Sequence, residues 1–382
     1  MRLQEEAGHA VAPFAMQDER NEGTPWSEFF VSNLETKRAV IGIGAVRQFC
    51  RAAWSLEAAR KFAQLCDAFR PDIIHVHNLY THLSPSVLAV AKKRGIPVVM
   101  TVHDYALVSA NYSLWNPRKS QSMSLDDIGV LATAKTRFVK GSCLATLVLE
   151  MILKMHHRLR LYDGAIAQYM MFSQFVKGVL VKSDFDEKKM TVMHAFVSSP
   201  SLRRRGSGGG LVLFAGRLES YKGVHVLLEA LRYLPSTVQV KIAGVGPDED
   251  RLKTMVGRDR RVEFLGFVPG DALGAMMGQA AVVVVPSIWH EPYGLVALEA
   301  MSQGTPVIVA KSGGLPEIVG ESGAGIVVPP NDPRALARAI ESVLDHPEKQ
   351  ESMGKAAQAR AEEIADPQAH LAKVMEVYSR CG

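Results

Sequence analysis

Short apolar runs alternate with longer segments of helical period along most of this 382-residue chain. Runs of about four to eight apolar residues between Gly, Pro or polar clusters are typical of buried strands. In the first half they predict strands at residues 9–16, 72–78, 97–103, 163–168 and 189–196. In the second half they predict strands at residues 211–215, 239–243, 262–265, 281–285, 306–310 and 325–328. Strands that alternate with helices predict an α/β protein with parallel sheets.

A glycine-rich segment divides these two sets of strands. Residues 201–210 contain three consecutive arginines followed by Gly and Ser, which is typical of a flexible linker. The length of the chain suits two domains. We therefore expect domains at residues 1–200 and 207–365, followed by a tail helix within residues 366–382. A helix is also expected over residues 333–344, with Asp332 as its N-cap and Pro333 in its first turn.

Two carboxylates flank the start of a helix in the second half. Glu291 precedes the helix that Gly294, Leu295 and Val296 open, and Glu299 lies eight residues further on. Eight helical residues span up to ~12 Å, and the free N–H groups of a helix start attract anions. The spacing therefore suits a sugar nucleotide, with Glu291 on the sugar hydroxyls and Glu299 on the ribose. The alternative is an ordinary pair of exposed glutamates on a crossover helix.

Two cations follow an apolar strand in the same half. The predicted strand at residues 211–215 ends at Gly216, and Arg217 and Lys222 follow it. Ligands bind at the carboxyl ends of parallel strands, and two cations there can neutralise a diphosphate without a metal ion. Each of them alone would be an ordinary surface cation.

These segments resemble the retaining glycosyltransferases of family 4. The resemblance rests on four motifs, at residues 216–223, 243–247, 291–299 and 312–317, and it extends more weakly over the first half. It implies the GT-B fold, in which two Rossmann-like domains face each other across a cleft and the tail helix crosses back to the first domain. It also implies a hexosyltransferase that uses a UDP- or GDP-linked sugar and no cofactor.

The resemblance assigns roles by position. Arg217 and Lys222 would hold the donor diphosphate, Glu291 the sugar and Glu299 the ribose, while the Gly216 turn and the amides of residues 294–296 face the donor. Transfer would retain the anomeric configuration, with the leaving phosphate accepting the acceptor's proton. Gly313 and Gly314 would let the backbone approach the donor, although glycines at this position also suit a helix-entry turn.

The first half contributes His103, Asp104 and Tyr105, directly after a predicted strand. The resemblance places His103 beside the donor sugar and makes it catalytic together with Arg217, Lys222 and Glu291. Asp104, Tyr105 and His77 would line the cleft or contact the acceptor. His75 and His77 share one face of their strand by alternation. No third metal ligand accompanies them, so we expect no metal site.

Charge is unevenly distributed. Residues 1–205 contain 27 Lys and Arg against 18 Asp and Glu, whereas the remaining residues contain 17 against 21. A basic first half suits an anionic or lipid-linked saccharide acceptor, or the inner membrane surface. No nucleic-acid recognition motif is present. Residues 144–153 form an apolar segment between basic flanks, which predicts either a helix lying in the headgroup region or an ordinary packed helix.

Nothing in the sequence predicts a membrane span or a secretory leader, and the four cysteines show no disulfide spacing. We therefore expect a cytoplasmic protein that acts in polysaccharide or glycolipid synthesis, with attachment to the inner membrane face as the alternative. The family pattern has a strand, a Gly-Gly loop and most of a helix before Gly8, and residues 1–7 match only the end of that helix. Residues 194–198 also lack the family's Asn and Asp. The competing functions are an inactive sugar-nucleotide-binding scaffold and a GT-B epimerase.

Overall fold

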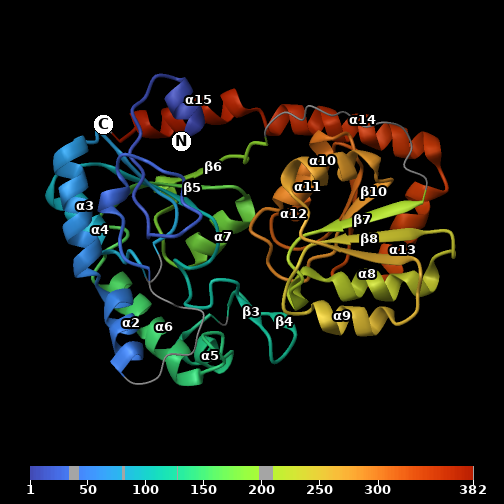
Figure 1. Cartoon of the computed structure of the whole chain (residues 1–382), viewed down its shortest axis with the longest axis horizontal. Coiled ribbons are helices and arrows are strands. Elements are labelled where there is room, and N and C mark those ends of the chain that lie inside the picture. The colour runs from blue at the N-terminus through green and yellow to red at the C-terminus, as the bar shows by residue number, and fades with distance from the viewer. Residues whose placement is uncertain (34–42, 80–81, 127, 198–209, 382) are drawn as a thin grey trace.

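The computed structural model describes residues 1–33, 43–79, 82–126, 128–197 and 210–381. Two separate parallel sheets organise these residues, the first built from the amino-terminal half and the second from the carboxyl-terminal half (Figure 1). The predicted linker at 201–210 lies outside the described residues except for Gly210. No helix in the described ranges is long and apolar enough to cross a membrane.

The first sheet has four parallel strands in the order β1-β2-β5-β6. They are β1 (Ile74–Val76), β2 (Val98–Val102), β5 (Ile166–Met171) and β6 (Met190–Val192). Every side chain of β2 is buried because the strand has a neighbour on each side and helices cover the sheet. A short antiparallel hairpin, β3 (Trp115–Asn116) and β4 (Gln121–Ser122), projects from this half.

The strand predicted at residues 9–16 is wrong. This segment makes one isolated parallel bridge, between Met16 and Val31, and joins no sheet. Pro13 has no N–H group to donate, and the segment is only partly buried. A single bridge therefore replaces the ladder that the apolar pattern suggested.

Helices cover the first sheet. They are α1 (Arg2–Glu6), α2 (Ile43–Ala53), α3 (Leu56–Phe69), α4 (Ser86–Lys93), α5 (Val130–Lys135), α6 (Cys143–Arg158) and α7 (Gln174–Lys182), with short 3₁₀ turns η1 (Ser27–Phe29) and η2 (Glu187–Lys189). Serine N-caps explain where several of them begin, since Ser55, Ser142 and Ser173 each accept from a backbone N–H in the first turn.

The second sheet has six parallel strands in the order β12-β11-β10-β7-β8-β9. They are β7 (Leu211–Ala215), β8 (Gln239–Ala243), β9 (Val262–Gly266), β10 (Val282–Val285), β11 (Val307–Ala310) and β12 (Gly325–Val328). The predicted ranges agree with these bounds to within one residue. Agreement is close because β10 and β11 are fully buried valine-rich runs that only a central parallel strand accommodates.

Helices also cover the second sheet. They are α8 (Val224–Ala230), α9 (Glu249–Val256), α10 (Gly270–Gln279), α11 (Leu295–Ser302), α12 (Leu315–Val319), α13 (Pro333–Leu344) and α14 (Pro347–Ile364), with 3₁₀ turns η3 (Ser220–Lys222) and η4 (Leu231–Tyr233). The expected helix at 333–344 is confirmed, and the Asp332 side chain accepts from the Ala335 N–H as its N-cap.

The last helix, α15 (Pro367–Ser379), returns to the first sheet. Figure 1 shows it in red above the blue and green half, beside α1. Val374 and Val377 pack against Val99 and Met170 of β2 and β5. The tail therefore contributes to the first core, although it follows the second half in sequence.

Candidate active site

The carboxyl ends of β7 and β10 form the edge of the second sheet at which the predicted residues lie. The two strands are neighbours, so the loops that follow them emerge side by side. Arg217 and Lys222 follow β7, and Glu291 follows β10. The topology therefore brings together three residues that are up to 74 positions apart in sequence.

Glu291 is buried and accepts four hydrogen bonds. Lys222 donates to both carboxylate oxygens at 2.9 Å. Oε2 also accepts from the Ser287 hydroxyl at 2.9 Å and from the Trp289 indole N–H at 2.8 Å. Lys222 Nζ lies 5.0 Å from the Trp289 ring centroid. The buried carboxylate is thus compensated by one cation and two neutral donors, as a buried charge requires.

Glu299 has the opposite surroundings. Its side chain is half-buried on α11 and makes no hydrogen bond or ion pair with any residue that the structure describes. Burial raises the pKa of this carboxyl group. Gly294, with φ of 115°, is the N-cap of α11, and the first N–H groups of this helix have no partner within it. An acceptor and several donors are therefore left available at one helix start.

Arg217 is the most exposed of the four predicted groups, with 69% of its side chain accessible to solvent. It donates to Glu219 at 2.6 Å. The turn before it is tight, because a Cβ on Gly244 would collide with the Gly216 carbonyl oxygen. The β7 turn thus fixes the backbone of Arg217 and leaves its guanidinium group in solvent.

Gly313 and Gly314 lie against the protein rather than open space. Gly313 has φ of 59°, and a Cβ there would collide with the Glu291 backbone. A Cβ on Gly314 would meet Ser173 and the Pro292 carbonyl oxygen, and the Gly314 N–H donates to the Glu291 carbonyl oxygen at 2.8 Å. Of the two interpretations of these glycines, the geometry favours the turn, which supports the loop that carries Glu291.

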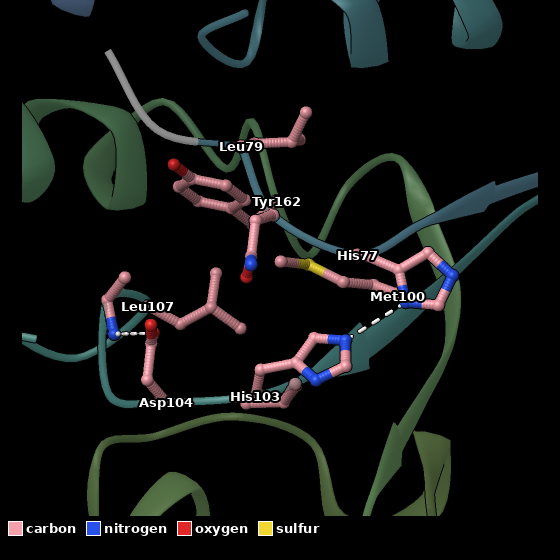
Figure 2. Close-up of a pocket in the computed structure, with 10 residues that line it drawn as sticks. His77, Leu79, Met100, His103, Asp104, Leu107 and Tyr162 are labelled. Carbon is pink, nitrogen blue, oxygen red and sulfur yellow. Dashed lines mark hydrogen bonds between the residues drawn. The ribbon is translucent and has the colours of Figure 1, made fainter. Parts of the chain in front are cut away.

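The first sheet contributes a pair of histidines at the ends of β1 and β2. His77 Nδ1 and His103 Nε2 are 2.9 Å apart, and both rings line a small pocket with Met100, Leu107 and Tyr162 (Figure 2). Loss of surrounding water, and then the neighbouring His103, lower the pKa of His77 to about 4. Burial also lowers the pKa of His103. One neutral ring therefore donates to the other at neutral pH.

His75 packs against His77, and its ring contacts the tail helix. Its ring stacks on His77 at 4.4 Å between centroids, which confirms that the two side chains share a face. Its two nitrogens contact Thr101 Oγ1 and the Tyr378 hydroxyl, each at 2.7 Å. Burial is the main reason that the pKa of His75 falls to about 3. Through Tyr378, the tail helix thus reaches the histidines.

Asp104 and Tyr105 do not both line the cleft as expected. The Asp104 carboxylate accepts from the Ala106 N–H at 2.9 Å, which shapes the turn after β2. Tyr105 is fully buried, and its hydroxyl donates to the His290 carbonyl oxygen at 2.8 Å. Its ring lies in the first core and its hydroxyl bridges to the residue before Glu291, so Tyr105 has almost no exposed surface for an acceptor.

Glu317, like Tyr105, connects the two halves of the chain. The sequence did not reveal this connection. Its carboxylate accepts from the N–H groups of Gln174 and Phe175 at 2.7 and 2.8 Å, so it caps α7 from the other half. Ser173, the N-cap of α7, donates to the Pro292 carbonyl oxygen at 2.7 Å. Glu317 is the last residue of the motif at residues 312–317, but only the tertiary structure shows which helix it caps.

Trp289 and Ser287 are the other residues that sequence reasoning missed. Trp289 lies two residues before Glu291, and an aromatic residue so close to a predicted site carboxylate is the available signal. Its ring packs 5.0 Å from Tyr221, which lies beside Lys222. The two aromatic rings and Ser287 thus surround the Lys222–Glu291 ion pair.

Two parallel α/β units with facing carboxyl edges and a returning tail helix define the GT-B class. Sucrose-phosphate synthase from Thermosynechococcus elongatus has this fold, with a TM-score of 0.70 at 20% identity over 99% of this chain and 90% of that one. Anabaena HepE, solved in complex with UDP and glucose, gives a TM-score of 0.63 at 20% identity over 84% and 81%.

Sequence comparison then gives the family. The model of glycosyl transferases group 1 matches residues 203–360, and that of the glycosyl transferase 4-like domain matches residues 1–143. The chain belongs to the family 4 glycosyltransferases, with a GT-B fold. An uncharacterized glycosyltransferase of Methanocaldococcus jannaschii is 42% identical over 139 residues, which span 35% of each chain. The aligned part is thus about a third of that relative.

Proposed function

We propose that the protein is a retaining hexosyltransferase that moves a sugar from a UDP- or GDP-linked donor to a hydroxyl of a lipid-linked or anionic saccharide. The observation that carries the proposal is the ion pair of Lys222 and Glu291 at the edge of the second sheet, together with Glu299 on α11, which has no partner among the described residues. Solved relatives include a complex with UDP and glucose, which supports a nucleotide-sugar donor. The basic first half supports an anionic acceptor.

Each residue has a role that its surroundings suit. Glu299 accepts the ribose hydroxyls, because it is half-buried and has no protein partner among the described residues. Lys222 and Arg217 balance the charge that develops on the leaving diphosphate, together with the amides at the start of α11. Glu291 holds Lys222 in place, and its Oε1, which accepts only from Lys222, keeps capacity for a sugar hydroxyl.

The first half then presents the acceptor. In this proposal His103 lies beside the donor sugar, and His77 fixes its ring orientation through their hydrogen bond. A neutral His103 can accept or donate a hydrogen bond without adding charge. Departure of the leaving group on the face that the acceptor approaches retains the anomeric configuration, and the leaving phosphate accepts the proton.

The test follows donor and acceptor separately. The protein is incubated with UDP-glucose or GDP-mannose, with and without a bacterial lipid extract, and nucleotide release and the product's anomeric configuration are measured. We expect release that depends on the extract and a product that keeps the donor's configuration. Lys222→Ala should abolish release, whereas Lys241→Ala, which removes a partly exposed lysine of the same sheet, should not.

Other outcomes identify the competing functions. A changed sugar on an intact nucleotide, without acceptor, would identify an epimerase. Tight nucleotide binding without release under any condition would identify a binding scaffold. An inverted product would contradict the retaining mechanism.

A further inference from the structure

Helix α6 buries mostly polar side chains. Its buried residues are Thr146, Glu150, Leu153 and His156, three of which are polar or charged. A surface helix normally buries an apolar stripe and exposes its polar face. The buried side of α6 thus does not account for the helix's apolar composition.

Several apolar residues of α6 lie on its outer face. At about 100° per residue, Leu144, Val148, Met151 and Met155 fall within a sector of roughly 60°. Leu144 is 69% exposed, Met151 58% and Met155 43%, and Leu159, the C-cap, is 61% exposed. These five residues are called the α6 stripe below. Scattered exposed apolar residues are normal, but a contiguous line of them indicates an interaction site.

Polar contacts on the inner face fix this orientation. Glu150 accepts from the Ala110 N–H at 2.8 Å, and His156 lies 2.8 Å from the Ala53 carbonyl oxygen. His157 lies 2.7 Å from the Leu107 carbonyl oxygen. Turning the helix to bury its stripe would break all three contacts and leave the backbone groups of Ala53, Leu107 and Ala110 without these partners. The stripe therefore stays outward in the folded chain.

Cations surround the α6 stripe. Residues 128–162 contain six Lys and Arg, and their single acidic residue, Glu150, is buried. Lys154, Arg158 and Arg160 lie on or just after α6, and Lys135 and Arg137 lie at the end of α5, which packs beside it. Leu131 of α5 is also exposed. Figure 1 shows α5 and α6 together at the lower end of the first half, away from α15.

We propose that the α6 stripe and its cations dock this protein on an anionic lipid bilayer. Apolar side chains enter the boundary between headgroups and acyl chains, while lysines and arginines pair with lipid phosphates. The charge argues against a second copy of the chain, because two such faces would repel each other. The apolar stripe argues against nucleic acid, whose backbone offers phosphates alone at its surface.

Docking of the α6 stripe on a bilayer would also orient the candidate active site. The inner face of α6 holds residues 107–110, which follow directly after His103 and its turn. The surface that meets lipid and the loop beside His103 are thus two sides of one helix. A lipid-linked acceptor would reach the protein on the half that presents it. This last step rests on the proposed function, whereas bilayer binding stands without it.

Vesicle flotation tests the proposal with the full chain. We expect binding to vesicles of phosphatidylcholine mixed with phosphatidylglycerol, and weak binding to phosphatidylcholine alone. Arg158→Glu with Arg160→Glu should lower binding to the mixed vesicles by at least about tenfold, because each cation near an anionic surface contributes to affinity. Arg258→Glu with Arg260→Glu makes the same charge change on the other half and should have little effect.

A second pair of variants tests the apolar contact. Met155→Gln should weaken binding, whereas Met255→Gln should not, although the two methionines are almost equally exposed. Nucleotide binding, measured on every variant, should remain unchanged and so report on folding. If nucleotide binding fails in the unaltered chain while vesicle binding persists, the proposed function falls and this inference stands.

Three results would overturn the inference. The first is equal binding to neutral and mixed vesicles, or none to either. The second is equal loss in the matched variants of the two halves. The third is a concentration-dependent dimer in sedimentation that Met155→Gln abolishes, which would assign the α6 stripe to self-association.

Discussion

Glu291 and Glu299 show how two carboxylates in one motif can differ at the scale of single residues. Glu291 accepts from Lys222, Ser287 and Trp289, whereas Glu299 has no partner among the described residues. The charge of the buried Glu291 carboxylate is compensated by its hydrogen-bond donors, so this residue holds those donors in position. A half-buried carboxylate without a partner, whose pKa burial raises, is available for hydroxyl groups of a ligand.

Replacing Glu299 should therefore weaken every ligand that contains the ribose. We expect Glu299→Gln to lower the affinity for UDP and for the intact donor alike. A hydrogen bond to a charged group contributes roughly 1.5–3 kcal/mol, which corresponds to about tenfold or more in affinity. Calorimetric titration with both ligands measures the two affinities.

Glu291→Gln is the variant with which Glu299→Gln is compared. It should reduce turnover and donor affinity while nucleotide affinity falls much less, because the released Lys222 can still reach the diphosphate. Equal loss of free nucleotide in both variants would contradict the separate roles.

The histidines at the ends of β1 and β2 predict a pH dependence of stability. Because the folded-state pKa values of His75 and His77 are about 3 and 4, both stay neutral well below the ordinary value of about 6.5. The unfolded chain binds more protons there, so stability should fall as the pH decreases from about 6.5 towards 4.

Urea unfolding of His75→Gln across this range measures the effect. The variant should be less sensitive to pH than the unaltered protein, whereas His346→Gln, which replaces an exposed histidine, should match it. Parallel pH profiles for all three proteins would show that His75 does not contribute.

At the scale of elements, the start of α7 depends on a residue of the other half. Glu317 accepts from the Gln174 and Phe175 N–H groups, and Ser173 bonds to Pro292. We expect Glu317→Gln to weaken this cap, and caps contribute about 0.5–2 kcal/mol. Hydrogen exchange should then quicken at residues 174–176, with little change at α3, whose cap, Ser55, is local.

The same variant should make the two halves separate more readily. Small-angle scattering should show a larger radius of gyration for Glu317→Gln. An unchanged radius together with faster exchange at α7 would limit Glu317 to capping.

At the scale of the whole molecule, the proposed function brings the donor diphosphate to protein cations at the edge of the second sheet. Arg217 and Lys222 together supply two positive charges, to which the start of α11 adds its dipole. We expect transfer to proceed in EDTA at a rate within about twofold of that in magnesium, as charge compensation by protein groups requires. Acceptor-dependent nucleotide release measures the rate. Loss in EDTA and recovery with Mg²⁺ or Mn²⁺ would contradict this prediction.

The sequence by itself determined the second sheet and the strand ends at which the candidate donor-binding residues lie. The run at residues 282–285 favours a central strand, because a central parallel strand is buried on both faces and β-branched valines suit strands. The Gly294 helix start and the Asp332 cap are also local, since they depend on residues within one turn. The motifs, and with them the family, could be read from neighbours in sequence.

Only the tertiary structure decided which groups are already paired. Glu291 and Lys222 are 69 residues apart, Glu317 caps a helix 142 residues earlier, and Tyr105 reaches His290. Residues 9–16 alternate like a strand but lack a sheet to join, and α6 buries polar residues that distant carbonyl groups fix. Hydrogen bonds and burial depend on partners brought close by topology. An apolar pattern shows that a face can be buried, and the fold determines what, if anything, covers it.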